Sequence, residues 1–272
     1  GWLERASNVQ SAWFNETRRG RFLDRATILY DRTQQTLFPL KIAYTNANDE
    51  IMMTAGNSVR RVANNDFATG EFSIYAPFLT LFNETRYLIW WDRDERLVIA
   101  EAPSSAALIN KRQIVTAFDE PDFALQGAFQ PTAIEHNGRL FVLSLVGQTE
   151  SRLDAVRLSS SDDLINWTHR TIELSKAAVP RPVLTALDGR LFVFFSGFQD
   201  KTQVRYLSSI DGETWSVERD LPIPTSFDPA GEVGTLGGIG VAPYRDGLAV
   251  SWVTDTDFVD FPIYTAMYRI AD

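Results

Sequence analysis

The chain has 272 residues, of which 44% are hydrophobic and 12% aromatic, so it can bury a substantial core and is not a disordered chain. Its net charge of −9, without long runs of like charge, disfavours nucleic acids and anionic membranes as partners. With no cysteine and two histidines, it excludes disulfides, thiolate metal sites, cysteine nucleophiles and three-histidine metal sites. No apolar stretch approaches the roughly 18 residues needed to span a membrane.

Short stretches rich in Val, Ile, Phe and Tyr, separated by turn residues, predict β-strands throughout the chain. One unit recurs five times, at residues 26–62, 76–116, 130–174, 181–221 and 238–269. The clearest pair is Asn137-Gly138-Arg139-Leu140-Phe141-Val142 and Asp188-Gly189-Arg190-Leu191-Phe192-Val193. Asn-Gly and Asp-Gly between apolar runs indicate tight β-hairpins, because both central residues need a positive φ.

A repeat of 40–50 residues that carries four strands is typical of a β-propeller. We therefore predict an all-β fold: a single five-bladed β-propeller with four-stranded blades, one domain spanning residues 1–272. The predicted blades are about 21–65, 71–117, 127–175, 178–222 and 236–272. The last unit is one strand short, and an unpaired edge is unfavourable. We expect an N-terminal strand, Trp2–Asn8 or Gln10–Phe14, to complete that blade.

Two turns carry a recognisable motif. The segment SSIDGETW, Ser208–Trp215, resembles the Asp-box of sialidases and related propellers. Its counterpart SSSDDLINW keeps Ser160, Asp162 and Trp167, with Leu164 in place of the glycine. This version resembles the outer hairpin of the arabinanase, β-xylosidase and invertase glycosidases, which are five-bladed. We expect both turns to be structural, with a carboxylate capping the turn and tryptophan packing between blades.

The resemblance implies a site in the central funnel, where glycosidases of this type use one carboxylate from each of the first three blades. Residues at the starts of the inner strands, and in the loops after the second strands, line such a funnel. The catalytic candidates are Asp24, Glu71 and Glu232. The substrate-binding candidates are Arg25, Tyr75, Phe78, Trp91, Phe129, Gln130, Arg181 and Asp255. Trp90, inside a predicted strand, is expected in the core.

Two positions depart from the family pattern. Ala76-Pro77-Phe78 resembles its Ala-Pro-Asp with phenylalanine replacing the acid, and Phe129-Gln130-Pro131 stands where an acid precedes glycine-proline. Either the alignment with the family is shifted by a few residues, so that Glu71 or Glu120 takes these roles, or the glycosidase chemistry is absent.

Three functions therefore stay open. They are a glycosidase-like carbohydrate-active enzyme, a non-hydrolytic enzyme of small-molecule biosynthesis such as a cyclase or isomerase, and a glycan-binding lectin without catalysis. The blades differ at every funnel position, which favours one asymmetric site over five equal ones.

The expected partner is a small molecule or glycan in the funnel, with no nucleic acid and no membrane. No cofactor or metal is predicted; relatives hold calcium in the channel, but no residue here indicates it. Three Asn-x-Thr sequons, at Asn15, Asn83 and Asn166, predict a secreted glycoprotein.

Overall fold

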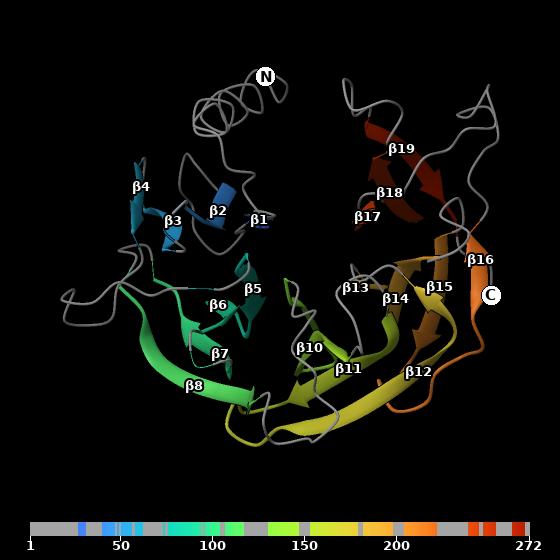
Figure 1. Cartoon of the computed structure of the whole chain (residues 1–272), viewed down its shortest axis with the longest axis horizontal. Coiled ribbons are helices and arrows are strands. Elements are labelled where there is room, and N and C mark those ends of the chain that lie inside the picture. The colour runs from blue at the N-terminus through green and yellow to red at the C-terminus, as the bar shows by residue number, and fades with distance from the viewer. Residues whose placement is uncertain are drawn as a thin grey trace.

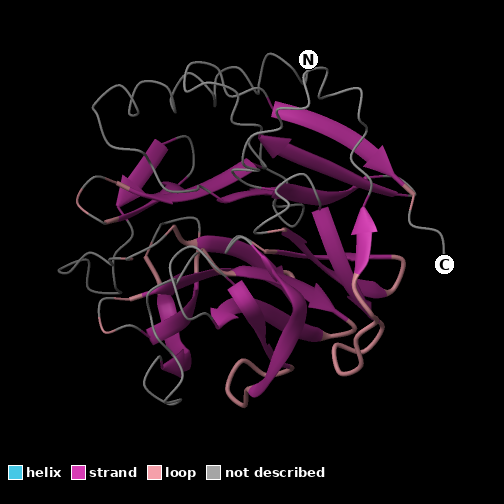
Figure 2. Cartoon of the chain, turned by 45° about the vertical axis from the view of Figure 1, so that its right-hand side comes forward, coloured by secondary structure: helices cyan, strands magenta, loops and turns pink. Residues whose placement is uncertain are grey.

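The fold is seen in a computed structural model, which describes a set of ranges separated by gaps. These are residues 27–30, 40–46, 48, 50–55, 58–61, 73, 76–92, 94, 96–103, 107–116, 130–146, 153–178, 182–197, 204–221, 239–244, 247–253 and 263–269. Within these ranges the secondary structure consists of β-strands (Figure 2). None of the described residues belongs to a helix long and apolar enough to cross a membrane.

The strands form five antiparallel sheets in which neighbours along the chain pair with one another. The first sheet contains β1 (Thr27–Tyr30), β2 (Leu40–Thr45), β3 (Ile51–Ala55) and β4 (Ser58–Arg61). The second contains β5 (Phe78–Phe82), β6 (Thr85–Trp91), β7 (Arg96–Glu101) and β8 (Ile109–Thr116). The third contains β9 (Thr132–His136), β10 (Arg139–Val146), β11 (Leu153–Ser161) and β12 (Thr168–Ala178). The fourth contains β13 (Val183–Leu187), β14 (Arg190–Ser196), β15 (Val204–Ser209) and β16 (Arg219–Leu221). The fifth contains β17 (Ile239–Tyr244), β18 (Gly247–Val253) and β19 (Ile263–Tyr268).

The five sheets are the blades of a propeller, as predicted. The first strand of each sheet is the inner one, and β1, β5, β9, β13 and β17 contact one another in that order. Figure 1 shows the sheets placed around a common centre. The fifth sheet has three described strands, and the expected closing strand, Trp2–Asn8 or Gln10–Phe14, lies outside the described residues.

Among the described residues the hydrophobic core forms four layers, one at each junction from the first blade to the fifth. Trp90 and Trp91 show how one strand serves two of them. Successive residues of a strand point to opposite faces. Trp90, fully buried, therefore packs between the first and second blades, and Trp91 packs between the second and third. The prediction that Trp90 is a core residue is confirmed.

Two inner hairpins have the tight turns that the sequence indicated. Both central residues have positive φ in Asn137-Gly138 (52° and 73°) and in Asp188-Gly189 (50° and 72°). The same turn occurs in the second blade as Asn83-Glu84, with φ of 48° and 60°. This is the pattern of a type I′ turn, whose twist matches the flanking strands.

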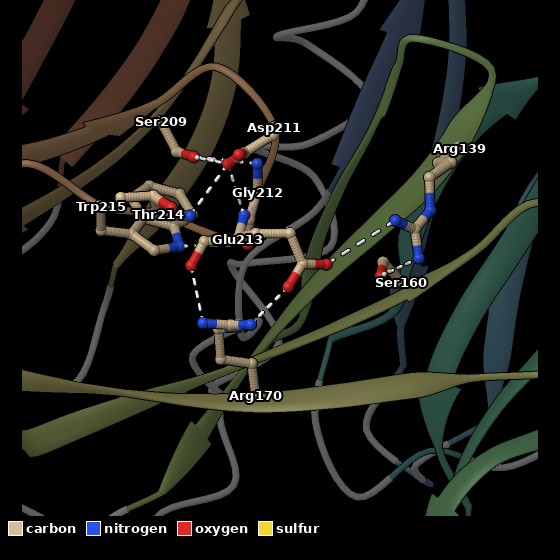
Figure 3. A network of polar contacts seen from close by, with 9 residues as sticks. All are labelled: Arg139, Ser160, Arg170, Ser209, Asp211, Gly212, Glu213, Thr214 and Trp215. Atoms are coloured by element: carbon tan, nitrogen blue, oxygen red, sulfur yellow. Dashed lines mark hydrogen bonds and ion pairs between the residues drawn. The ribbon is translucent and has the colours of Figure 1, made fainter.

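The Asp-box of the fourth blade is a turn organised by one carboxylate (Figure 3). Asp211 Oδ1 accepts hydrogen bonds from the backbone N–H groups of Glu213 and Thr214, at 2.7 and 2.9 Å. Ser209 Oγ accepts from Gly212 N at 2.8 Å, and Trp215 Nε1 donates to Gly212 O at 3.2 Å. The motif is therefore structural, as expected.

The third blade contains the same turn, one residue later than the sequence suggested. Asp163 Oδ1 accepts from the backbone of Ile165 and Asn166, and Ser161 Oγ accepts from Leu164 N. The assignment of Ser160 and Asp162 to the box is therefore wrong. Strand register explains the shift, since Phe141 pairs with Ser160 as Phe192 pairs with Ser208. Leu164 takes the glycine position, as predicted, at a φ of 60°.

An ion-pair network ties the fourth-blade Asp-box to the third blade (Figure 3). The Glu213 carboxylate bonds Arg170 of β12, and Arg170 Nη1 donates to Glu213 O at 2.6 Å. On its other side Glu213 faces Arg139 of β10 at 3.8 Å, and Arg139 Nη2 donates to Ser160 Oγ at 2.9 Å. These half-exposed charges fix neighbouring blades in register more than they stabilise the fold.

Candidate functional site at the starts of the inner strands

The inner strands of the second, third and fourth blades, β5, β9 and β13, lie side by side and start at the same end of the propeller. Two hydrogen bonds between neighbouring blades establish this alignment. Leu184 N, in the second position of β13, donates to Oγ1 of Thr132, the first residue of β9, at 3.1 Å. Thr80 Oγ1 of β5 lies 3.5 Å from the carbonyl oxygen of Ala133. Each strand start thus lies beside the next, and residues at or just before these starts surround one mouth of the channel.

Phe78 and Gln130 come together at this mouth. Phe78 is the first residue of β5 and is half-buried against the core between the second and third blades. Gln130 precedes β9 by two residues, and its Nε2 donates to the carbonyl oxygen of Pro77 at 2.8 Å. This bond fixes the glutamine side chain of the third blade beside the start of the second. The start of the second blade therefore bears a half-buried aromatic ring, and the Gln130 amide is anchored to the residue before it.

Two loops between second and third strands open toward the same end, and they share one backbone arrangement. In the second blade, Asp92 Oδ1 accepts from Asp94 N at 3.1 Å and Arg96 N at 3.0 Å. In the first blade, Asn46 Oδ1 accepts from Asn48 N at 2.9 Å and Glu50 N at 3.0 Å. Both loops are also closed by a backbone bond between their ends.

The described charges of the second-blade loop are paired with one another, and Asp92 also lies 4.0 Å from Lys111 Nζ of β8. The buried Asp92 carboxylate binds Arg96 through Nε at 3.0 Å and Nη2 at 2.8 Å. Arg96 Nη2 also contacts the exposed Asp94 at 2.6 Å. Asp92 is therefore a structural carboxylate that holds the loop, while Asp94 and Arg96 present an ion pair to solvent. Aligning TNANDE with WDRDER would have revealed this shared loop from the sequence.

The structure corrects one predicted site residue. Trp91 was expected to contact a ligand at the rim, yet it is 1% exposed and packs with Ile89, Leu97 and Leu140 between two blades. The physical reason is that both faces of β6 are covered by neighbouring blades. Alternation within the strand therefore directs Trp91 into a second core layer and not toward the funnel.

The other candidates are not all described. Phe78 and Gln130 are described, at the starts of the second and third blades, and their role in binding a ligand stays a prediction. The remaining ones lie outside the described residues: Asp24, Arg25, Glu71, Tyr75, Phe129, Arg181, Glu232 and Asp255. Glu120 lies outside them as well. In the described part of the chain, no three His, Asp or Glu side chains gather closely enough to hold a metal ion.

No protein-family model matches the sequence, and no curated protein matches it significantly. Solved structures do match. The endo-arabinase from Bacteroides thetaiotaomicron aligns with a TM-score of 0.55 at 14% identity, covering 93% of this chain and 96% of that one. The catalytic domain of a family 62 α-L-arabinofuranosidase from Coprinopsis cinerea aligns with a TM-score of 0.56 at 10% identity, covering 92% and 90%. A family 43 α-L-arabinofuranosidase from Clostridium thermocellum gives 0.54 at 12%, covering 85% and 81%.

The fold is that of the family 43 and family 62 glycoside hydrolases. The likeness extends over nearly the whole of each chain, so it concerns the complete five-bladed ring. At 10–14% identity it defines the architecture alone.

Within this architecture, the two departures noted in the sequence keep their places. Phe78 begins the inner strand of the second blade, and Gln130 lies directly before Pro131 at the start of the third. Phe129, which stands at the acid position of the third blade in the sequence comparison, lies outside the described residues, and both explanations of the departures stay predictions. If the alignment is shifted by a few residues, Glu71 and Glu120 are the acids that the sequence supplies for the second and third blades.

Proposed function

We propose that this chain is a carbohydrate-active protein with one asymmetric ligand site at the mouth where the inner strands start. The observation that carries the proposal is that the described strand starts differ from blade to blade. Directly after a buried proline, the inner strand begins with Phe78 in the second blade, Thr132 in the third and Val183 in the fourth. A lectin with five equivalent sites would repeat one set of side chains, and the blades here do not.

The proposed chemistry is hydrolysis of a glycoside by two carboxyl groups. Asp24, which precedes the inner strand of the first blade in the sequence, is the first acid, with Glu71 or Glu232 as its partner. The ring of Phe78 supplies an apolar surface for a sugar face, and the Gln130 amide supplies a polar contact. The matched structures are named as arabinofuranosidases and an endo-arabinase, so arabinofuranosides and xylosides are the first substrates to test.

The test compares the wild-type chain with Asp24→Asn on a panel of aryl arabinofuranosides, xylosides and other glycosides. Asp24→Asn is expected to lower kcat/KM by about 100-fold or more, the usual contribution of a general acid or base. Asp188→Asn is the matched control, since Asp188 lies in an inner hairpin turn at the opposite end of its strand and asparagine tolerates its φ of 50°. Full activity in Asp24→Asn would remove Asp24 from the mechanism.

The second candidate is a non-hydrolytic enzyme acting on a partly apolar small molecule. It is favoured by Phe78 standing where the glycosidase pattern has an acid, because a phenyl ring cannot transfer a proton. On this reading the wild-type chain hydrolyses and binds no glycoside but binds apolar small molecules, and Phe78→Ala weakens that binding. Glycan binding without hydrolysis would instead support a lectin.

A further inference from the structure

Two of the Asn-x-Thr sequons lie in described parts of the chain, and their surroundings differ. We propose that Asn83 is an attachment site for an N-linked glycan and that Asn166 is not. The third, at Asn15, lies outside the described residues. The proposal concerns the end of the propeller opposite the funnel mouth, and it is independent of what the funnel binds.

Asn83 is displayed by a rigid turn. It is exposed and occupies the first central position of the type I′ turn between β5 and β6. Its backbone N–H donates to Glu135 Oε2 of the third blade at 2.9 Å, which holds the turn against the neighbouring blade. The sequon threonine, Thr85, is exposed at the start of β6. A glycan on the Asn83 side chain would therefore extend into solvent without displacing the fold.

The second blade departs from the repeat where this sequon arises. The equivalent turns of the third and fourth blades read Asn-Gly-Arg and Asp-Gly-Arg, and their glycines have φ of 73° and 72°. The second blade reads Asn-Glu-Thr, which places Glu84, a residue with a side chain, at a φ of 60°. A left-handed conformation is unfavourable by about 1–2 kcal/mol for such a residue. The fold does not explain this substitution, whereas a requirement for Asn-x-Thr explains the change at the third position.

Asn166, in contrast, is explained by the Asp-box. Its backbone N–H donates to Asp163 Oδ1 at 2.8 Å, and its side-chain Nδ2 donates to Asp163 Oδ2 at 2.7 Å. The middle residue of this sequon, Trp167, is the tryptophan of the box and packs against the core between the second and third blades. The amide that would carry the sugar is already part of the turn. This sequon is therefore a by-product of the motif.

The modification needs a co-substrate, a lipid-linked oligosaccharide of the eukaryotic secretory pathway. Nδ2 of Asn83 attacks the anomeric carbon of the oligosaccharide, the bond from that carbon to the lipid pyrophosphate breaks, and Nδ2 loses one proton. No oxidant or reductant is involved. Because Asn83 ends an inner strand that starts at the mouth, the glycan would lie at the far end of the propeller and leave the funnel open.

The experiment is secretion of the full chain from a eukaryotic host, followed by glycopeptide mass spectrometry with and without an endoglycosidase that converts the glycosylated asparagine to aspartate. Asn83 is expected to be occupied and Asn166 unoccupied in the folded product. Asn83→Gln and Thr85→Ala should each remove that glycan. Thr85→Ser and Glu84→Gly are matched controls, because both keep an Asn-x-Ser/Thr sequon.

Mapping of the wild-type chain decides the matter even if a variant folds poorly. A secreted, folded chain with Asn83 unmodified would overturn the proposal, and so would a glycan on Asn166 at comparable occupancy. Both readouts are independent of ligand binding and hydrolysis, so failure here leaves the proposed function untouched.

Discussion

At the scale of single residues, the two Asp-box turns solve the same packing problem with side chains of different size. Gly212 of the fourth-blade box lies against Phe141, a ring of the third blade that is 1% exposed. Leu164 takes the equivalent place in the third-blade box. Its side chain is buried in the core layer between the second and third blades, against which Tyr87 also packs. The position needs a positive φ in both turns, and in one of them it also needs the absence of a side chain.

We predict that Gly212→Ala destabilises the fold by about 2–4 kcal/mol, the sum of an unfavourable positive φ and of overpacking. The added Cβ would lie 2.3 Å from Cε1 of Phe141, a ring that the core holds in place. Gly189→Ala is the control, with nearly the same φ but no atom within 4 Å of the new Cβ, and should cost about 1–2 kcal/mol. Urea unfolding measures both, and equal losses would contradict the packing argument.

At the scale of the element, each Asp-box is a turn that depends on an ionised carboxylate. The backbone N–H groups of Asn166 and Ile165, with the Asn166 side chain, lower the pKa of Asp163 well below its usual value. The backbone N–H groups of Thr214 and Glu213 lower the pKa of Asp211 in the same way. Hydrogen bonds to the charged form favour it, so the folded turn stabilises the carboxylates and they stabilise the turn.

We predict that Asp163→Ala lowers the urea midpoint at pH 7 and that Asp162→Ala leaves it nearly unchanged. The folded pKa of Asp163 is lowered, so its contribution to stability is complete above the unfolded pKa of about 3.9 and is lost as pH falls toward the folded pKa. The difference between wild type and Asp163→Ala should therefore narrow below about pH 4. A larger loss in urea midpoint from Asp162→Ala than from Asp163→Ala would show that Asp162, as expected from the sequence, is the aspartate of the box.

At the scale of the whole molecule, the ring has one blade with three described strands and four blades with four. Among the described strands, β19 pairs with β18 along one edge and with none along its other edge. The N-terminal segment carries two stretches suited to pair with its other side, Trp2–Asn8 and Gln10–Phe14. Unpaired edges favour association between chains.

We predict that deleting residues 1–20 lowers the unfolding midpoint and promotes oligomers or aggregates. Size-exclusion chromatography with light scattering, together with thermal unfolding, measures both effects. A truncated chain as stable and monodisperse as the full chain would show that these residues do not close the ring. A chain with Trp2 and Trp13 replaced by serine serves as a milder control for the apolar side chains alone.

Much of this architecture follows from local chemistry. Asn137-Gly138 and Asp188-Gly189 predict their hairpins because few other residues accept positive φ at both central positions, and the repeat of these turns predicts the blades. The Asp-box motif likewise predicts a capped turn. In the third blade the sequence reads SSSDD from Ser159 to Asp163, so it does not determine which serine and which aspartate form the box. Only the pairing of β10 with β11 decided that.

The sequence by itself determined the strand content and the five repeats, and it predicted departures from the glycosidase pattern at Phe78 and Phe129. Local turn chemistry and period suffice for these features, because they depend on residues close together in the chain. The tertiary structure alone decided that Trp91 belongs to a core layer, that Gln130 is anchored to Pro77 and that the Asn166 side chain is bound to Asp163 within its turn. Each of these depends on contacts between strands, turns or blades whose relative positions are fixed only when the ring assembles.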